Sequence, residues 1–331
     1  QLASTRHLSA ASPCIGAGSA KDATGTDIDG EPWANPPCIG ADQFVPGGGS
    51  GPLQPRIEAG HTNFAVGFAA AFVGHIEGQA TASTWDFGDG TGATNQPWIS
   101  HAWTAPGDYT VRLTAFNRDQ SGGVTAALEV RVIEANYFVN EANPAPVFPF
   151  TSWATAATNI QQAIDAGTEP GRLVLVTNGL YRTGCVTNNG LNRVNVTATV
   201  ILRSVNGPEV TVIEGAPASL GGPIRCAYLG TEAVLSGFTL TNGYTRYWSE
   251  WPTPEWPRVC GGGALCERSA TVTNCVLSGN SAYSGGGVAG GTLENCVLSG
   301  NTAAQDGGAA YKGTLRHCFV SGNSTKEGGS G

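Results

Sequence analysis

The chain has 331 residues, enough for two or three domains with a substantial core. Glycine is abundant at 48 residues, 13% of residues are charged and 40% are hydrophobic, which favours turn-rich β structure over disorder. The formal net charge of −8 gives no electrostatic footprint for nucleic acid, and no apolar run approaches the ~18 residues of a membrane span.

Residues 1–45 show no regular strand or helix pattern and are rich in turn-forming residues. We expect an irregular cap segment closed by a disulfide between Cys14 and Cys38. Asp27 and Asp29 are interpreted as loop residues. The alternative is a Ca²⁺ loop, but two carboxylates fall short of a full oxygen cage.

Short strands between regular turns predict a small β-sandwich over residues 53–134, behind a Gly/Pro linker at 46–52. Two motifs carry this prediction: Trp-Asp-Phe-Gly-Asp-Gly at 85–90 and His-Ala-Trp-Thr-Ala-Pro-Gly-Asp-Tyr at 101–109. They resemble a PKD-type (Ig-like) domain. The resemblance implies a spacer or interaction module of a secreted protein.

The acidic turn of this domain has two interpretations. Trp85 and Phe87 should be core residues on one strand face, while Asp86 and Asp89 shape the turn by accepting hydrogen bonds from backbone amides. The alternative is a metal ion bound by the two carboxylates.

Residues 135–331 begin with an extended segment and one short helix. A capping box at 158–161 starts the helix and Gly167 stops it. Three apolar residues share one of its faces: Ile160, Ala163 and Ile164. Strand-like runs bounded by Asn-Gly pairs follow.

The clearest pattern is a repeat: residues 271–280, 292–301 and 314–323 each read Thr, two variable residues, Asn or His, Cys, two apolar residues, Ser, Gly, Asn. Cysteine and asparagine recur after 21 and then 22 residues. This period predicts a solenoid of β coils stacked roughly 4.8 Å apart. Equivalent positions form two predicted structural ladders: Cys275, Cys296 and Cys318, and Asn280, Asn301 and Asn323.

These coils resemble the right-handed parallel β-helix of the pectin-lyase-like superfamily, and more narrowly secreted bacterial proteins with "NCxLSGNxAxxGGG" coils. The resemblance covers most of 137–331 and implies that the short helix caps the first coil. The cysteine ladder is expected to be an inward stack of buried thiols, with a bridge between neighbouring coils as the alternative. Disulfides between Cys185 and Cys226 and between Cys260 and Cys266 would suit an extracytoplasmic protein.

A long excursion at residues 244–258 interrupts the coils and contains Trp248, Trp251 and Trp256. Such an aromatic loop must bury its rings. Three interpretations stay open: packing over the flank of the coils, contact with another protein, or stacking on a sugar.

No catalytic constellation is recognised. The acidic residues of the repeated coils are scattered, and no carboxylate pair, nucleophile elbow or phosphate loop appears. The sequence therefore predicts no enzyme and, apart from the Ca²⁺ alternative, no cofactor.

The order of the parts is unusual. The motifs Ser-Pro-Cys at 12–14, Thr-Asp-Ile-Asp-Gly at 26–30 and Cys-Ile-Gly-Ala at 38–41 resemble the tail that follows the last coil in the same β-helix family, here with Gly16 and Cys38 replacing the usual Asp. Because the sequence lacks Met and begins with Gln, we expect a processed or excised piece.

An uncovered coil at the C-terminal end would expose a strand edge and apolar core. Residues 1–45 of a neighbouring copy, residues 1–45 of the same chain, or further coils of a longer chain could cover it. We favour a head-to-tail filament or repeat array formed by β-augmentation. The expected contacts are Phe319, Val320 and Ser321 on the coil, and Cys14, Ile15 and Ile39 on the tail.

The predicted function is thus an extracellular structural or adhesive protein that binds copies of itself. The alternative is a glycan-binding or polysaccharide-degrading module of a larger secreted protein.

Overall fold

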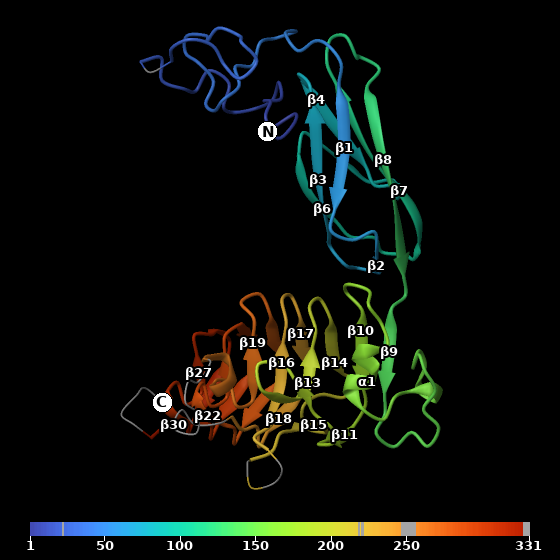
Figure 1. Ribbon diagram of the computed structural model, residues 1–331, viewed down its shortest axis with the longest axis vertical. Coiled ribbons are helices and arrows are strands. Elements are labelled where there is room, and N and C mark those ends of the chain that lie inside the picture. Colours follow the sequence, from blue (N-terminus) through green and yellow to red (C-terminus); the bar gives the residue numbers. More distant parts are fainter. Residues whose placement is uncertain (22, 218, 220–221, 246–255, 327–331) are drawn as a thin grey trace. The chain divides into compact units, whose positions relative to one another are not determined.

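The computed structural model describes residues 1–21, 23–217, 219, 222–245 and 256–326, and divides into two compact units, Gln1–Glu134 and Ala135–Gly331 (Figure 1). The regular secondary structure of both units is mainly strand, so the all-β class predicted from sequence is confirmed. Among the described residues, no helix is both long and apolar enough to span a bilayer.

The first unit contains two sheets. One is antiparallel, with β3 (Ala70–Glu77) between β1 (Gln54–Ala59) and β6 (Trp98–His101). The other contains, in spatial order, β2 (Asn63–Ala65), β8 (Val124–Ile133), β7 (Gly107–Phe116), β4 (Ala82–Asp86) and β5 (Gly92–Thr94). Side chains alternate between buried and exposed along β3, so one face of its sheet contributes to the core.

The core of this unit is aromatic. Trp103 and Phe72 are 1% exposed, and the predicted core residues Trp85 and Phe87 are also buried, which confirms that prediction. Each indole donates a hydrogen bond: Trp85 Nε1 to Gln96 O (2.8 Å) and Trp103 Nε1 to Phe87 O (3.1 Å). The rings therefore fill the core without leaving a buried donor unpaired.

Residues 1–45 precede the first strand. Among the described residues they form only isolated bridges, Leu2 with Leu8 and Thr26 with Pro32. Side chains satisfy many of their backbone amides, as the irregular composition predicts.

The second unit begins with β9 (Asn136–Val139), a 3₁₀ turn η1 (Trp153–Thr155) and α1 (Ile160–Asp165). The buried face of α1 is Ile160, Ala163 and Ile164, as predicted. The expected capping box at 158–161 is wrong in one respect: Asn159 is the N-cap, and its side chain accepts a hydrogen bond from Gln161 N (2.8 Å). Adjacent Thr and Asn are both good N-caps, so sequence alone could not choose between them.

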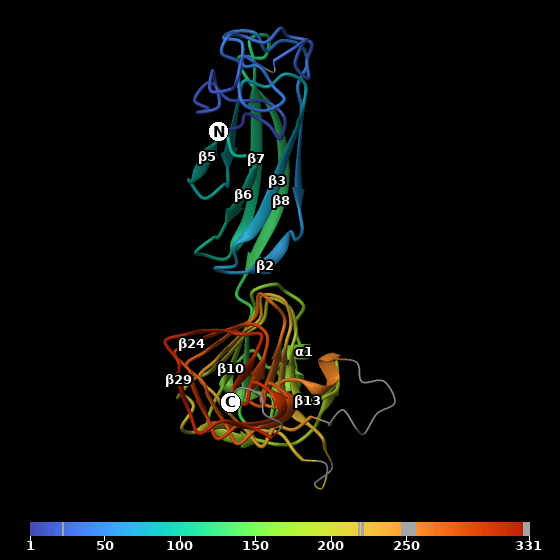
Figure 2. The ribbon, with the colours of Figure 1, turned by 90° about the vertical axis from the view of Figure 1, so that its left-hand side faces the viewer.

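Most of the second unit is a stack of parallel strands (Figures 1 and 2). The longest sheet contains, in spatial order, β28 (Thr314–Arg316), β24 (Thr292–Glu294), β20 (Thr271–Thr273), β17 (Val234–Ser236), β14 (Ile201–Ser204), β10 (Leu173–Val176) and β9. The second contains β11 (Gly179–Tyr181), β15 (Thr211–Glu214), β18 (Thr239–Thr241), β21 (Val276–Ser278), β25 (Val297–Ser299) and β29 (Phe319–Ser321).

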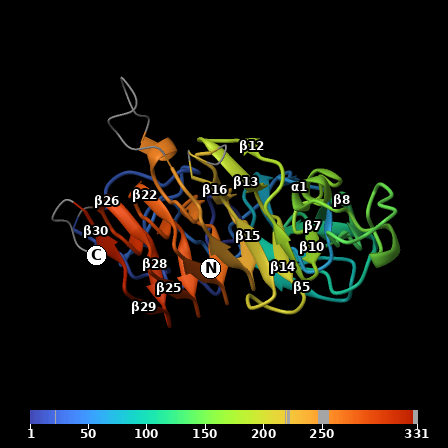
Figure 3. The ribbon, with the colours of Figure 1, turned by 90° about the horizontal axis from the view of Figure 1, so that it is seen from below.

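Two further sheets complete the stack (Figure 3). One contains β12 (Val186–Thr187), β13 (Leu191–Val196), β16 (Arg225–Leu229), β19 (Ala264–Cys266), β23 (Val288–Ala289) and β27 (Ala310–Tyr311), and only its β12–β13 pair is antiparallel. The other contains β22 (Ser281–Ser284), β26 (Thr302–Asp306) and β30 (Ser324–Thr325). Neighbouring strands of each sheet come from successive turns of the chain, an arrangement compatible with a parallel β-helix.

Columns of apolar side chains fill the stack. Along one sheet Leu235, Val272 and Leu293 are paired in register, and all three are 0% exposed. Because each side chain rests on its register partner, a coil is covered only when coils lie on both sides of it.

The expected disulfides are wrong for this structure. All nine cysteines lie in the described residues, and all are free thiols. Cys38 Sγ points inward and accepts a hydrogen bond from Phe44 N (3.4 Å), whereas Cys14 borders an open pocket. Cys185 is exposed while Cys226 is fully buried, so these two side chains face different surroundings.

Cys260 and Cys266 are both buried free thiols. Cys260 forms an isolated backbone β-bridge with Ser284. Further along the chain β19, which ends at Cys266, pairs with β23 of the next coil. Burial raises the pKa of each of these thiols to about 12, so neither is ionised near neutral pH.

Candidate functional site

The residues predicted as an interface lie on β29. Phe319, Val320 and Ser321 are all exposed, Phe319 by 65% and Val320 by 44%. β28 beside them is exposed along its whole length. We call β28, β29 and β30 together the coil edge; they are the last described strands of their sheets (Figure 3).

Exposure at the coil edge follows from position in the stack rather than from residue type. Leu293 on β24 is 0% exposed, and its register partner Leu315 on β28 is 39% exposed. Leu298 on β25 is 0% exposed, against 44% for its partner Val320. The coil edge therefore presents apolar side chains that are buried one coil earlier.

The asparagine ladder reaches this edge. Asn301 Oδ1 accepts hydrogen bonds from Asn280 N (3.1 Å) and Nδ2 (3.0 Å), and Asn323 Oδ1 accepts the same pair from Asn301 (both 2.9 Å). At the edge, Asn323 Nδ2 donates to Leu298 O of the previous coil (2.9 Å) and to Ser321 O, two residues back in its own coil (3.0 Å). The amide proton that Asn301 donates to the next coil is thus donated by Asn323 within the last coil.

The cysteine ladder points inward. Cys275 and Cys296 are each 1% exposed, and Cys318 in the last coil is partly exposed. Their thiols donate to backbone carbonyls, for example Cys275 Sγ to Thr273 O (3.2 Å) and Cys296 Sγ to Glu294 O (3.3 Å). This is a packing role for small, buried side chains.

The tail residues predicted to meet this edge lie together in the first unit. Ile39 N donates a hydrogen bond to Cys14 O (2.8 Å), and Ile15 follows Cys14 directly. Ile39 is 52% exposed, while Cys14 and Ile15 are partly buried. The tail and the coil edge belong to different units, so a contact between them stays a prediction.

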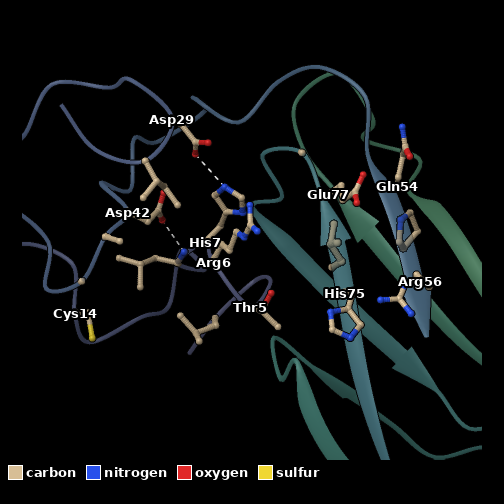
Figure 4. A pocket seen from close by; sticks show the side chains of 18 of the residues that line it. Thr5, Arg6, His7, Cys14, Asp29, Asp42, Gln54, Arg56, His75 and Glu77 are labelled. Carbon is tan, nitrogen blue, oxygen red and sulfur yellow. Dashed lines mark hydrogen bonds and ion pairs between the residues drawn. The ribbon is translucent and has the colours of Figure 1, made fainter. Parts of the chain in front are cut away.

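A charged cluster in residues 1–45 was not recognised from sequence. His7, Asp29 and Asp42 each offer one ligand atom, and these atoms lie within 4.8 Å of one another. All three residues border an open pocket (Figure 4). They are far apart in the sequence, and only a lone histidine in an Asp-rich loop segment could have indicated them.

Of the two aspartates considered in the sequence analysis, Asp29 belongs to this cluster and Asp27 does not. Asp27 accepts hydrogen bonds from the backbone amides of Asp29 (2.9 Å), Glu31 (2.8 Å) and Gln43 (2.8 Å), so it shapes the loop. Burial raises the pKa of Asp27, but these amides outweigh that effect and lower it below the ordinary value. Burial raises the pKa of Asp42, an effect opposed by the Leu8 amide and by His7.

In the acidic turn of the sandwich, the carboxylates of Asp86 and Asp89 accept hydrogen bonds. Asp86 Oδ1 accepts from the amide two residues further on (2.9 Å), and Asp89 Oδ1 accepts from Thr91 N (3.0 Å) and Oγ1 (2.6 Å). Asp89 Oδ2 lies 2.7 Å from His101 Nε2, a partner that the sequence analysis missed. Burial raises the pKa of Asp89, but the bonds from Thr91 and His101 lower it overall.

The aromatic excursion falls mainly outside the described residues. This applies to Trp248 and Trp251, whereas Trp256 begins η4 (Trp256–Val259). The three interpretations of this loop stay predictions.

A buried arginine fixes the C-terminal base of the excursion. Arg225 is 1% exposed and donates to Pro257 O (3.0 Å), Cys260 O (2.7 Å) and Asn192 Oδ1 (2.6 Å). Burial lowers the pKa of Arg225 to about 10, so the guanidinium stays charged at neutral pH and needs these acceptors.

Comparison with known proteins identifies one domain. Residues 56–132 match the PKD domain family, which spans β1 to β8 of the sandwich. PKD domains are typically extracellular. No curated protein matches the chain.

One solved structure with some similarity comes from work entitled "Structural basis for the promiscuous specificity of the carbohydrate-binding modules from the beta-sandwich super family". The two chains are 18% identical with a TM-score of 0.24. The match covers 28% of this chain and 38% of the other. This likeness is too slight to carry an argument about function.

Proposed function

We propose that the chain is a secreted structural or adhesive protein whose second unit is a right-handed parallel β-helix, extended at the coil edge by a further coil. The observation that carries the proposal is the change in exposure between register partners, from 0% at Leu298 to 44% at Val320. The PKD domain supports an extracellular setting.

Covering the coil edge would be favourable. Phe319, Val320 and Leu315 would each gain about 1–2 kcal/mol on burial. Asn323 could then donate to the next coil, as Asn301 donates to Asn323. A strand added in register would also pair with the edge backbone, which is how β-augmentation supplies affinity.

The proposed occupant is the 1–45 segment of a neighbouring copy, with Ile39, Cys14 and Ile15 against β29. This contact is heterologous, because the two surfaces differ, and a repeated heterologous contact gives a filament. In a longer chain, the next repeat of the array would fill the same place.

A non-enzymatic role is part of the proposal. The carboxylates considered as metal ligands in the sandwich, Asp86 and Asp89, accept turn hydrogen bonds, which accounts for their presence without a bound ion.

Sedimentation velocity over a range of concentrations tests this function. The wild-type chain should form concentration-dependent oligomers, and Phe319→Glu should remain monomeric because its charge lies in the contact. Val147→Glu is the matched control, since Val147 is 55% exposed in the same unit but lies outside the coil edge. A wild-type chain that stays monomeric, or a Phe319→Glu variant that assembles normally, contradicts the proposal.

A further inference from the structure

The His7–Asp29–Asp42 cluster has the geometry of a metal site. Its three ligand atoms lie within 4.8 Å of one another. Ligands held about 2.0–2.2 Å from one ion are at most about 4.4 Å apart, so only small side-chain movements would place all three around it.

The second observation is the state of the histidine. His7 is 7% exposed, and its Nδ1 lies 2.8 Å from Ser4 Oγ. Nε2 lies 2.9 Å from Asp29 Oδ2, as the dashed line in Figure 4 marks, but outside hydrogen-bond geometry. Among the described residues this buried nitrogen therefore has no hydrogen-bond partner. Leaving such a group unsatisfied costs about 1–3 kcal/mol, which a bound cation would offset.

The local excess of negative charge also favours binding of a cation. Asp27, Asp29, Glu31 and Asp42 lie close enough to repel one another, and His7 is the basic side chain that opposes them. Asp42 is 6% exposed and receives one hydrogen bond, from Leu8 N (2.7 Å). Buried carboxylates need a charge partner or a metal ion.

We propose that His7 Nε2 and the carboxylates of Asp29 and Asp42 bind one divalent transition-metal ion of the Zn²⁺ type. An imidazole with two carboxylates suits Zn²⁺ better than Ca²⁺, which takes oxygen ligands. Binding at Nε2 requires the tautomer in which Nδ1 donates a hydrogen bond, and Ser4 Oγ lies 2.8 Å from Nδ1 as its acceptor. Water from the open pocket would complete the coordination.

The ion would act as a structural staple. The described residues of the 1–45 segment form no strand, and the three ligands come from distant parts of that segment. Small segments with little core commonly rely on a metal or a disulfide for stability. Asp27 takes no part in coordination in this proposal, because its oxygens hold the amides that position the Asp29 loop.

Isothermal titration of the EDTA-treated full chain with ZnCl₂ and CaCl₂ tests the site. We expect one tight Zn²⁺ per chain, weaker Ca²⁺ binding and a higher melting temperature for the first unit with Zn²⁺. Loss of an outer partner of a metal ligand costs about 10–100-fold in affinity, so His7→Gln should cost at least that. Asp29→Asn should do the same without disturbing the fold, because the hydrogen bond of Asp29 N to Asp27 is retained. His61→Gln, at an exposed histidine, is the control.

Cobalt distinguishes this site from the free thiols. Co²⁺ bound by nitrogen and oxygen should show d–d bands without a thiolate charge-transfer band, and His7→Gln should abolish them. The proposal is overturned by a thiolate band, by Zn²⁺ binding that survives both variants, by Ca²⁺ binding as tight as Zn²⁺ binding, or by no Zn²⁺ binding at all.

Discussion

The two units bury their apolar side chains in different ways. The PKD sandwich encloses large aromatic rings such as Trp103 between two sheets, and the cluster is complete within the unit. The strand stack covers each coil with the next, so Leu298 is buried while Val320 is not. The contribution of an apolar side chain to stability therefore depends on its burial between two sheets in the first unit. In the second unit it depends on whether a further coil covers the side chain.

The largest expected effect is in the sandwich. Trp103→Ala removes a ring packed against Phe64 and Phe72 and should lower the free energy of unfolding of that unit by about 3–5 kcal/mol. Chemical denaturation should show an earlier transition for the first unit alone. Trp98→Ala, at a residue 58% exposed, should change it by less than about 1 kcal/mol.

Within the stack, the largest difference in stability loss is expected between register partners inside the stack and at the coil edge. Leu298→Ala should destabilise the second unit by about 2–5 kcal/mol, because it leaves a cavity in a closed column. Val320→Ala, one coil later, should cost less than about 1 kcal/mol in the isolated chain. Equal losses in urea denaturation would mean that something already covers the coil edge.

In the asparagine ladder, too, a substitution inside the stack should cost more stability than the equivalent substitution at the coil edge, with smaller values at both positions. Asn301→Ala removes hydrogen bonds at a site 0% exposed and should cost about 2–3 kcal/mol. Asn323→Ala should cost about 1 kcal/mol, because Asn323 is partly exposed and water can replace its hydrogen bonds. A costlier loss at Asn323 would contradict this expectation.

The smallest effect concerns pH. The pKa of Asp89 is lowered in the folded state, so its contribution is full above the ordinary Asp value of about 3.9 and is lost as pH falls through the folded value. Asp89→Asn should reduce stability at pH 7 by about 1 kcal/mol and flatten the acid side of the profile. Melting curves of wild type and variant between pH 7 and pH 2 measure this. A variant with an unchanged acid profile would exclude Asp89 as a source of pH dependence.

Sequence reasoning succeeded where the signal was local or periodic. The three-copy repeat predicted the strands on which Leu277, Leu298 and Val320 pair in register, and the Trp-Asp-Phe motif predicted the core positions of Trp85 and Phe87. Both patterns place apolar residues at alternate positions, which is the period of a strand with one buried face.

It failed where side chains meet across irregular backbone. Nothing in the spacing of His7 and Asp42 indicates that they are neighbours, because turns rather than a strand or helix period bring them together. The cysteine pairs were wrong for a related reason: composition allowed bridges, but all nine cysteines of the structure are free thiols, and sequence spacing does not show which side chains meet.

Electron cryomicroscopy of the protein at assembling concentrations tests the central claim most directly. A head-to-tail assembly predicts continuous density in which a strand from residues 1–45 of a neighbouring copy lies beside β29, about 4.8 Å away. A solvent-facing β29 in every particle would contradict it.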